Sequence, residues 1–293
     1  MSELVEALLG EHAARVARFF QNDLAGVVGL DDAPTRIVEA VNYSLLAGGK
    51  RVRPALVLEW CRVSGGELDL ATAAAAAIET IHTFSLVHDD LPCMDDDDLR
   101  RGRPTNHKVF GQAMAVLAGD AMTTAAFEVL ARCYEPKVAI DLIRELARAT
   151  GPAGMIGGQV LDIEAENKTV SAEELQTIHA KKTGALLQCA CVMGARLAGG
   201  DAQAAATYGQ HLGLSFQIAD DLLDVSATPE AMGKATGKDA TAGKNTYPAL
   251  WGVDEARRRA MQECDAALAA VEPLGPAADG LRALARFTVE RGR

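Results

Sequence analysis

Residues 81–111 read IHTFSLVHDDLPCMDDDDLRRGRPTNHKVFG and change abruptly from apolar to acidic character. Their first part closes an apolar, alanine-rich segment that we expect to be one helix, capped near Asp69 and reaching about Leu91. Pro92 ends this helix, because proline lacks an amide hydrogen and disfavours the α conformation in the residue before it. Asp89 and Asp90 therefore stand at a helix end, and four more aspartates follow at 95–98.

The rest of the chain has the same helical character. Periodicity and breaks at proline or glycine predict helices at 2–28, 35–47, 54–63, 107–133, 137–149, 152–166, 172–198 and 202–225, with one or two more after 246. Ser171 and Glu174 have the spacing of a capping box. Strand signals are nearly absent, and residues 226–245 are typical of a loop or short helix. We predict an all-α fold with one domain over residues 1–293.

The composition of the chain argues against several classes of function. The 29 basic and 40 acidic side chains give a formal charge of −11, which argues against nucleic-acid binding. The six cysteines form no Cys-x-x-Cys pair, so they predict no zinc site and fit a reducing compartment. The amino-terminal segment lacks a signal-peptide pattern, and no uncharged apolar run reaches the ~18 residues of a membrane helix. We therefore expect a cytoplasmic protein without stable membrane insertion.

A second acidic cluster lies in FQIADDLLD at 216–224, near the end of an apolar helix. Asp220 and Asp224 are four residues apart, so their carboxylates share one helix face, and Asp221 lies beside them. Like charges at this spacing raise each other's pKa unless a cation lies between them. A solvated helix end would have the same sequence, so that alternative stays open for this cluster alone.

The first cluster is ambiguous in the same way. Asp95 is six residues after Asp89, off register in a straight helix, but a break at Pro92 could return it beside Asp89. An acidic run alone is more often a solvated loop, yet Arg100 and Arg101 follow at once. Carboxylate oxygens suit Mg²⁺, and guanidinium groups suit a diphosphate. The two clusters together therefore predict a site for a Mg²⁺-bound diphosphate.

Seven segments, in order along the chain, resemble those of the trans-polyprenyl diphosphate synthase family. They are GGKRVRP at 48–54, the segment at 81–111, LAGDA at 117–121, GGQVLDIEAE at 157–166, IHAKKTGAL at 178–186, FQIADDLLD at 216–224 and GKNTYPAL at 243–250. DDLPCMD followed by RRG is similar to the family's first aspartate-rich motif, in its bacterial and plant spacing, and DDLLD is similar to its second. The resemblance implies an isoprenoid synthase fold, a bundle of about 10–13 helices around a deep central cavity, and a homodimer.

The resemblance also implies roles for individual residues. Mg²⁺, three ions in the family, would be held by Asp89, Asp90, Asp95, Asp220, Asp221 and Asp224. The diphosphate of isopentenyl diphosphate would be bound by Lys50, Arg53, His82 and Arg101. The allylic diphosphate would be bound by Arg100, Lys182, Thr183, Gln217, Lys234 and Lys244. Outside the resemblance a lone buried histidine is more often a core residue, and the roles of Lys238, Arg291 and Arg293 stay open.

The implied reaction is a condensation of isopentenyl diphosphate with dimethylallyl or geranyl diphosphate. The allylic diphosphate leaves, the double bond of isopentenyl diphosphate attacks the resulting cation, and a proton is lost to the released diphosphate. The protein would position the substrates, stabilise charge and exclude water. A non-catalytic regulatory subunit of the same fold and a terpene cyclase are the alternatives. Two complete acidic motifs argue against the first, and the isopentenyl-binding set argues against the second.

Product length depends on thinner evidence. Phe84 is five residues before Asp89 and Ser85 follows it, so on a helix the ring lies roughly 7–8 Å deeper than the carboxylate. A ring at that depth predicts a floor, and the resemblance to bacterial farnesyl diphosphate (C15) synthases favours the same product. Other segments, TNHKVFG and VLAGDA among them, are closer to geranylgeranyl diphosphate (C20) synthases, so C20 stays the alternative.

Overall fold

The computed structural model describes residues 3–226 and 245–290, and the regular structure in those ranges is almost entirely helical. Its elements in chain order are α1 (Glu3–Asn22), α2 (Leu24–Val28), η1 (Leu30–Asp32), α3 (Thr35–Leu45), α4 (Val52–Val63), α5 (Leu68–Asp89), β1 (Leu99–Arg100), β2 (Arg103–Pro104), α6 (Asn106–Phe110), α7 (Gln112–Cys133), α8 (Pro136–Thr150), α9 (Met155–Ala165), α10 (Ala172–His179), η2 (Ala180–Gly184), α11 (Ala185–Leu197), α12 (Ala202–Ser226), α15 (Tyr247–Trp251), α16 (Val253–Ala270), η3 (Glu272–Ala278) and α17 (Asp279–Glu290). The predicted all-α class is confirmed.

Most predicted helices are present with small shifts, but 2–28 is divided into α1 and α2, 172–198 is interrupted by η2, and three α-helices rather than one or two follow residue 246 in the described residues. Residues 107–133 form two helices rather than one, because Gly111 has a φ of +90° and separates α6 from α7. The predicted cap at Asp69 is wrong. Glu67 occupies the N-cap position of α5, and the Asp69 carboxylate pairs with Arg15. The predicted capping box at the start of α10 is confirmed. The segment 227–244, predicted as a loop or short helix, lies outside the described residues.

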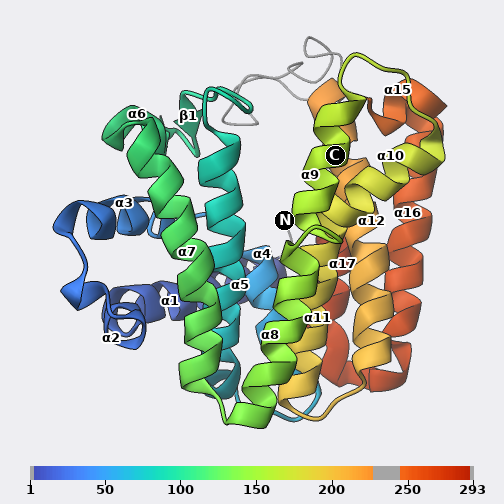
Figure 1. The fold of residues 1–293 in the computed structure, drawn as a ribbon. Coiled ribbons are helices and arrows are strands. Elements are labelled where there is room, and N and C mark those ends of the chain that lie inside the picture. Colours follow the sequence, from blue (N-terminus) through green and yellow to red (C-terminus); the bar gives the residue numbers. More distant parts are fainter. Residues whose placement is uncertain (1–2, 227–244, 291–293) are drawn as a thin grey trace.

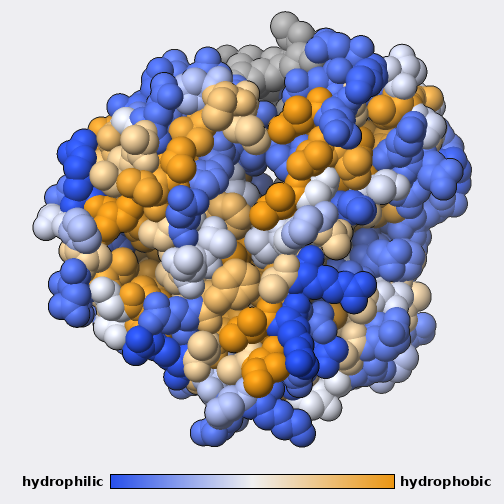
Figure 2. Space-filling model, viewed as in Figure 1, coloured by the Kyte–Doolittle hydropathy of each residue, from blue (hydrophilic) through white to orange (hydrophobic). Residues whose placement is uncertain are grey.

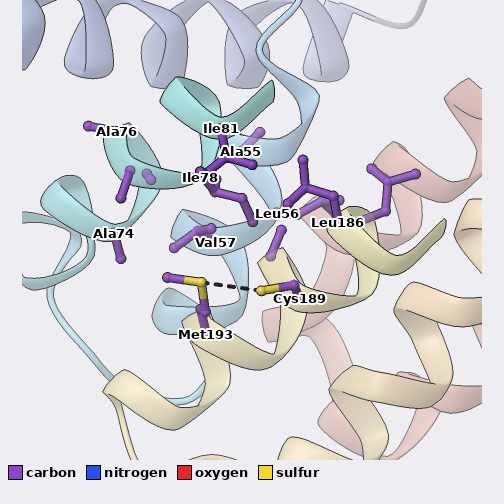
Figure 3. Packing of buried hydrophobic residues seen from close by; sticks show 14 of the residues in the cluster. Ala55, Leu56, Val57, Ala74, Ala76, Ile78, Ile81, Leu186, Cys189 and Met193 are labelled. Atoms are coloured by element: carbon purple, nitrogen blue, oxygen red, sulfur yellow. Dashed lines mark hydrogen bonds between the residues drawn. The ribbon is translucent and has the colours of Figure 1, made fainter. Parts of the chain in front are cut away.

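The centre of the bundle is built from α4, α5 and α11 (Figure 1). Figure 3 shows Leu56 of α4, Ile78 of α5 and Leu186 of α11 meeting in this core, where all three are fully buried. The central helix α5 presents a run of buried alanines, and such small side chains let neighbouring helices approach closely. On α11, a side chain at Gly194 would begin 2.2 Å from the carbonyl oxygen of Val57 in α4, so the α4–α11 contact requires glycine there.

A smaller apolar cluster supports the carboxyl-terminal helices. It joins Leu175 of α10, Ile218 of α12, Tyr247 of α15 and two small residues of α16. The Tyr247 ring stacks on Trp251 at 4.5 Å between ring centres. This packing fixes the chain that follows residue 244 against the helix that carries the second acidic cluster.

Two helices, α5 and α7, are long and apolar enough to span a membrane by length and composition alone. The most apolar window of α5 is 72% buried inside the protein, which is the behaviour of a core helix. The corresponding window of α7 is only 44% buried, so this helix presents an apolar face to the outside of the chain.

Candidate active site

The first acidic cluster forms where α5 ends. After Asp89 the chain turns back through residues 90–94, and the Asp95 amide donates a hydrogen bond to the Asp89 carbonyl oxygen over 2.8 Å. The predicted return of Asp95 beside Asp89 is therefore confirmed. The turn places Asp96 in the left-handed region at a φ of +49°. Asp89 and Asp95 both line one cavity, whereas Asp90 points elsewhere.

Asp90 is buried and engages Arg100 instead of the cavity. The Arg100 guanidinium donates from Nε over 2.9 Å and from Nη2 over 2.5 Å to one oxygen of Asp90. Arg100 is held in place by the short antiparallel pair β1–β2, whose two strands surround the Arg101–Gly102 turn. Arg100 itself lines the cavity, so the Asp90 carboxylate orients a cation that faces the site.

The second acidic cluster approaches the same cavity from α12. Asp220 and Asp221 line the cavity, and Asp224, near the end of α12, does not. One oxygen of Asp221 accepts a hydrogen bond from the Tyr247 amide over 2.9 Å, which ties α12 to the start of α15. The predicted meeting of two clusters far apart in sequence is thus present for four of the six aspartates, Asp89, Asp95, Asp220 and Asp221.

The cavity has a volume of about 590 Å³ and is lined by α5, α9, the η2 turn and α12, together with Arg53 of α4, Arg100 of β1, His179 of α10 and residues 94, 95 and 245–246. In Figure 2 the surface is hollowed between α7 and α9, and apolar residues lie on both sides of the hollow. Acidic residues from opposite sides thus share one enclosed space with basic and apolar side chains.

Burial in this cavity disfavours the ionised form of the carboxylates. The pKa of Asp89 is raised to about 6, chiefly by burial; the charges of Asp95 and Asp90 add to the rise, and those of Lys182 and Arg100 oppose it. Burial also raises the pKa of Asp90 in spite of its hydrogen bonds from Arg100. Ionised carboxylates in such a site gain stability from a bound cation.

The donor set fits Mg²⁺ bound together with a phosphorylated ligand. In the ranges that the structure describes, no three Asp, Glu, His or Cys side chains converge closely enough to enclose an ion by themselves. Mg²⁺ uses few protein carboxylates and completes its six positions with water and substrate phosphate oxygens. A pair of carboxylates on each side of a cavity matches that preference better than a closed protein cage would.

A basic group lies beside the first cluster. Arg53 and His82 line the cavity, and the Arg53 Nε atom is buried without a hydrogen-bond partner. Burial lowers the pKa of Arg53 to about 10, so its guanidinium remains charged at neutral pH. Burial also lowers the pKa of His82 far below its ordinary value, and nearby arginines lower it further, so this ring is neutral.

Two of the predicted isopentenyl-binding residues do not line the cavity. The Lys50 ammonium lies over the Phe287 ring, 5.3 Å from its centre, near the carboxyl-terminal end. The Arg101 guanidinium donates a hydrogen bond to the Gly48 carbonyl and rests against Gly49, where a side chain would begin 2.5 Å from the guanidinium carbon. Gly49 has a φ of +121°, a second reason for glycine at this position.

The opposite wall holds three of the predicted allylic-diphosphate residues. Lys182 and Thr183 belong to η2, one turn of π-helix between α10 and α11. The Lys182 ammonium contacts an Asp162 oxygen at 2.6 Å, and the Thr183 hydroxyl donates to the Gln217 side-chain oxygen over 3.0 Å. All three predicted residues line the cavity. Lys234 and Lys244, the remaining two candidates on this side, and the open positions Lys238, Arg291 and Arg293 lie outside the described residues.

The structure adds polar residues that the sequence analysis does not single out. Gln159 and Asp162 of α9 line the cavity, three residues apart on one helix face, as do His179, Asn245 and Thr246. The side-chain amide nitrogen of Asn245, Nδ2, donates to the backbone carbonyl oxygens of residues 165 and 168, which joins this segment to the end of α9. The polar spacing inside GGQVLDIEAE is the one signal that could have identified Gln159 and Asp162.

Comparison with known proteins agrees with this geometry. The family model described as polyprenyl synthetase matches residues 34–272. The chain belongs to the polyprenyl synthetase family. This polyprenyl synthetase is 46% identical over 243 residues to the farnesyl diphosphate synthase of Geobacillus stearothermophilus, a match covering 80% of this chain and 82% of that one.

Two further comparisons extend the same result. The chain is 50% identical over 234 residues to putative geranylgeranyl pyrophosphate synthase 8, chloroplastic, of Arabidopsis thaliana, covering 76% of this chain and 65% of the plant chain. Its fold is similar, at a TM-score of 0.83 and 32% identity, to the geranyltransferase of Helicobacter pylori, solved with magnesium and isoprenyl diphosphate; 99% of this chain and 97% of that chain are covered. The resemblance seen in the sequence is confirmed, and the chain is a prenyltransferase of the isoprenoid synthase fold.

The polyprenyl synthetase cavity has an apolar side as well. Phe84 and Ser85 line it from α5, and Met155, Ile156 and Val160 line it from α9. Phe84 is 7% exposed, and its ring meets the His88 ring edge-on at 5.8 Å. The side chain of His88 is in turn hydrogen bonded to the Val116 carbonyl of α7 over 3.0 Å. The ring at the predicted floor position is therefore braced by a neighbour that contacts the adjacent helix.

Proposed function

We propose that this prenyltransferase condenses isopentenyl diphosphate with dimethylallyl or geranyl diphosphate and gives farnesyl diphosphate (C15). The observation that carries the proposal is the convergence of two acidic clusters and a separate Arg53–His82 group on one cavity with an apolar side. A cyclase would need one diphosphate site, whereas this cavity has positively charged groups on two walls. A regulatory subunit would have no use for acidic residues from both helices in the same space.

Mg²⁺ would supply positive charge to the leaving diphosphate, and Asp89, Asp95, Asp220 and Asp221 would hold the metal. The proposal includes three Mg²⁺ ions, as in the family, with Asp90 and Asp224 as further ligands. Lys182 and Arg100 face the same diphosphate and neutralise charge that builds up on it. Thr183 and Gln217 offer hydrogen-bonding groups beside them. Because these groups are fixed before the substrate arrives, they need little reorganisation as the allylic cation forms.

The second substrate would be positioned by the basic group on the other wall. Arg53 has an unpaired buried N–H for a phosphate oxygen, and the neutral His82 can donate a further hydrogen bond. Lys50 and Arg101 do not line the cavity, and they would reach the same phosphate from its outer side. The apolar residues of α5 and α9 keep water from the cation, and the proton lost at the end goes to the released diphosphate.

Phe84 supports C15 as the product length. Its buried ring stands one to two turns below Asp89 on α5, at a depth of a little more than one isoprene unit, so the ring would form a floor that limits growth of the chain. The similarity to plant geranylgeranyl synthases keeps C20 as the alternative, since a chain of that length would have to pass Phe84.

The test is product analysis with Mg²⁺, dimethylallyl diphosphate and excess isopentenyl diphosphate. The wild type should release mainly C15, and Phe84→Ala should shift the main product to C20 or longer because the floor is removed. Val87→Ala, a truncation on the same helix at a residue outside the cavity lining, should still give C15. A wild type that makes C20, or a Phe84→Ala product of unchanged length, contradicts the proposed floor.

The functional unit would be a cytoplasmic homodimer. Helices α6 and α7 present Val109, Val116 and Leu117 with exposed fractions of 44%, 41% and 53%. Figure 2 shows this apolar surface over α7. A second copy of the chain covering it would remove the apolar area from water, which favours association.

A further inference from the structure

A buried ion pair lies directly behind the basic wall of the cavity. Arg51, between Lys50 and Arg53 in sequence, turns inward and donates from Nη1 to a Glu79 oxygen over 2.5 Å and from Nη2 to the Leu45 carbonyl over 2.5 Å. The two side chains are only 4% and 2% exposed. Charges this deeply buried are rare unless they are paired and hydrogen bonded, as these are.

The pair also holds an unusual backbone. Arg51 has a φ of +50°, in the left-handed region that a non-glycine residue rarely adopts, and it occupies the N-cap position of α4. Its neighbours Gly48 and Gly49 also have positive φ, so the loop has little regular structure of its own. Glu79 on α5 and the Leu45 carbonyl on α3 therefore fix this loop from two helices at once.

Three arginines, Arg51, Arg53 and Arg101, lie near the Glu79 carboxylate. Its carboxylate acts on three arginines: it is bonded to Arg51, and its negative charge partly opposes the fall in the pKa of Arg53 and Arg101 that burial causes. Arg53 and Arg101 repel each other, as Arg51 and Arg101 do. Arg100, the fourth guanidinium near His82, is paired with Asp90 and Asp97. Glu79 is thus the carboxylate bonded to this arginine group, and Asp220, across the cavity, also acts on Arg53, the member of the group that lines the cavity.

We infer that Glu79 is a positioning residue for the isopentenyl diphosphate half of the site, which it organises by holding Arg51 and the loop at 48–53. This inference rests on the proposed function. In this arrangement Glu79 never contacts the substrate. It holds Arg51 by a direct ion pair, and the anionic substrate would add negative charge beside Arg53 at the cavity wall.

The test compares Glu79→Gln, which keeps the shape and removes the charge, with wild type in steady-state kinetics for each substrate separately. The KM for isopentenyl diphosphate should rise ~10-fold or more, because small displacements of binding groups are costly, while the KM for the allylic substrate stays within about twofold. Glu79→Asp should recover part of the loss, since it restores the charge. Glu59→Gln is the matched control: Glu59 is a buried carboxylate bonded to His12 and Arg62, away from the cavity. It should lower Tm without changing either KM.

A double variant, Arg51→Met with Glu79→Met, separates positioning from stability. Replacing both members of a buried ion pair often restores stability, whereas removing one leaves an uncompensated charge. The double variant should therefore regain Tm but keep the raised KM for isopentenyl diphosphate. If it regains both, the pair is only structural and the inference is wrong. The inference is also wrong if Glu79→Gln lowers that KM or raises both KM values equally. A wild type that shows no saturable dependence on isopentenyl diphosphate would instead overturn the proposed function.

Discussion

Individual side chains in this site are set by burial as much as by charge. Asp89 and Asp90 are adjacent in sequence, yet one faces the cavity and the other is buried against Arg100. Helix geometry explains the difference, because Asp90 keeps the α conformation of α5 and consecutive side chains on a helix point about 100° apart around its axis. The acidic motif predicts both residues at the site, but which of them meets a ligand directly depends on this local turn.

His179 gives a pH prediction at the same scale. Burial is the main cause that lowers its pKa to about 4, and its ring lies edge-on to Tyr247. In the unfolded chain a histidine binds its proton near pH 6.5, so the unfolded state gains protons first as pH falls and stability is lost between about pH 6.5 and pH 4. At pH 5 the loss due to His179 should be about 2 kcal/mol relative to pH 7.5.

Denaturant unfolding at the two pH values measures this effect. His179→Gln should reduce the difference in unfolding free energy between pH 7.5 and pH 5 by that amount, and Thr177→Ala, an exposed neighbour in α10, should leave it unchanged. An equal pH dependence in His179→Gln and wild type would show that His179 does not carry the linkage.

At the scale of the elements, the π-helical turn η2 explains how the second wall is built. A turn of this kind inserts an extra residue into a helix and is frequent at functional sites. Here it separates α10 from α11 and carries Lys182 and Thr183 towards α9 and α12. The close contact on the α9 side depends on Gly158, where a side chain would begin 2.2 Å from the Lys182 backbone nitrogen.

Gly158→Ala should therefore disturb both packing and activity. The obstructing atoms belong to the backbone, so α9 and η2 must separate, and overpacking of this kind costs about 1–3 kcal/mol. The Lys182–Asp162 contact should lengthen with it, and the condensation rate should fall ~10-fold or more. Gly10→Ala in α1, where nothing lies within 4 Å, should leave activity unchanged and raise stability slightly. Thermal unfolding and initial rates check both variants; a fully active, stable Gly158→Ala would refute the tight contact.

Sequence reasoning is strongest for elements and weakest for the irregular parts between them. Apolar periodicity and Pro92 predict α5 and the return of Asp95, because both follow from local rules. The π turn was not predictable, since residues 172–198 have one continuous helical pattern and the inserted residue depends on contacts with α9. The β1–β2 pair and the inward turn of Arg51 depend on partners distant in sequence. The contacts that Lys50 and Arg101 make outside the cavity lining depend on such partners too, Phe287 for Lys50 and Gly48 for Arg101.

The described part of the molecule has an active-site cavity of about 590 Å³ and, in α7, a long helix with exposed apolar residues. The main hydrophobic core extends from α1 to α17, which supports the prediction of a single domain without testing it. Helix α7 packs on α5 and also contacts α2, α3, α6 and α8, but only 44% of its most apolar window is buried, so the proposed dimer would use the exposed part of this helix. In a monomer the apolar residues of α7 would be exposed to water, and in the proposed dimer they would be buried in the interface.

Analytical sedimentation tests the proposed homodimer. The 30.8 kDa chain should sediment at twice its mass, and Leu117→Glu should shift it to the monomer because a charge would be buried in the interface. Val253→Glu, at an apolar residue of similar exposure at the start of α16, should remain dimeric. A wild-type monomer at micromolar concentration, or a dimeric Leu117→Glu, would show that α7 does not form the interface.

The central claim is that two acidic clusters act together on one diphosphate. Its most direct test is the initial rate of diphosphate release with Mg²⁺, dimethylallyl diphosphate and isopentenyl diphosphate. Release should require the metal and both substrates. Asp89→Ala and Asp220→Ala should each lower it by ~100-fold or more, since each removes charge stabilisation of the leaving group. Asp98→Ala, in the same acidic run but paired with Lys108 and outside the cavity lining, should retain the wild-type rate. Release that needs only one substrate, or survives the loss of either Asp89 or Asp220, would contradict the account.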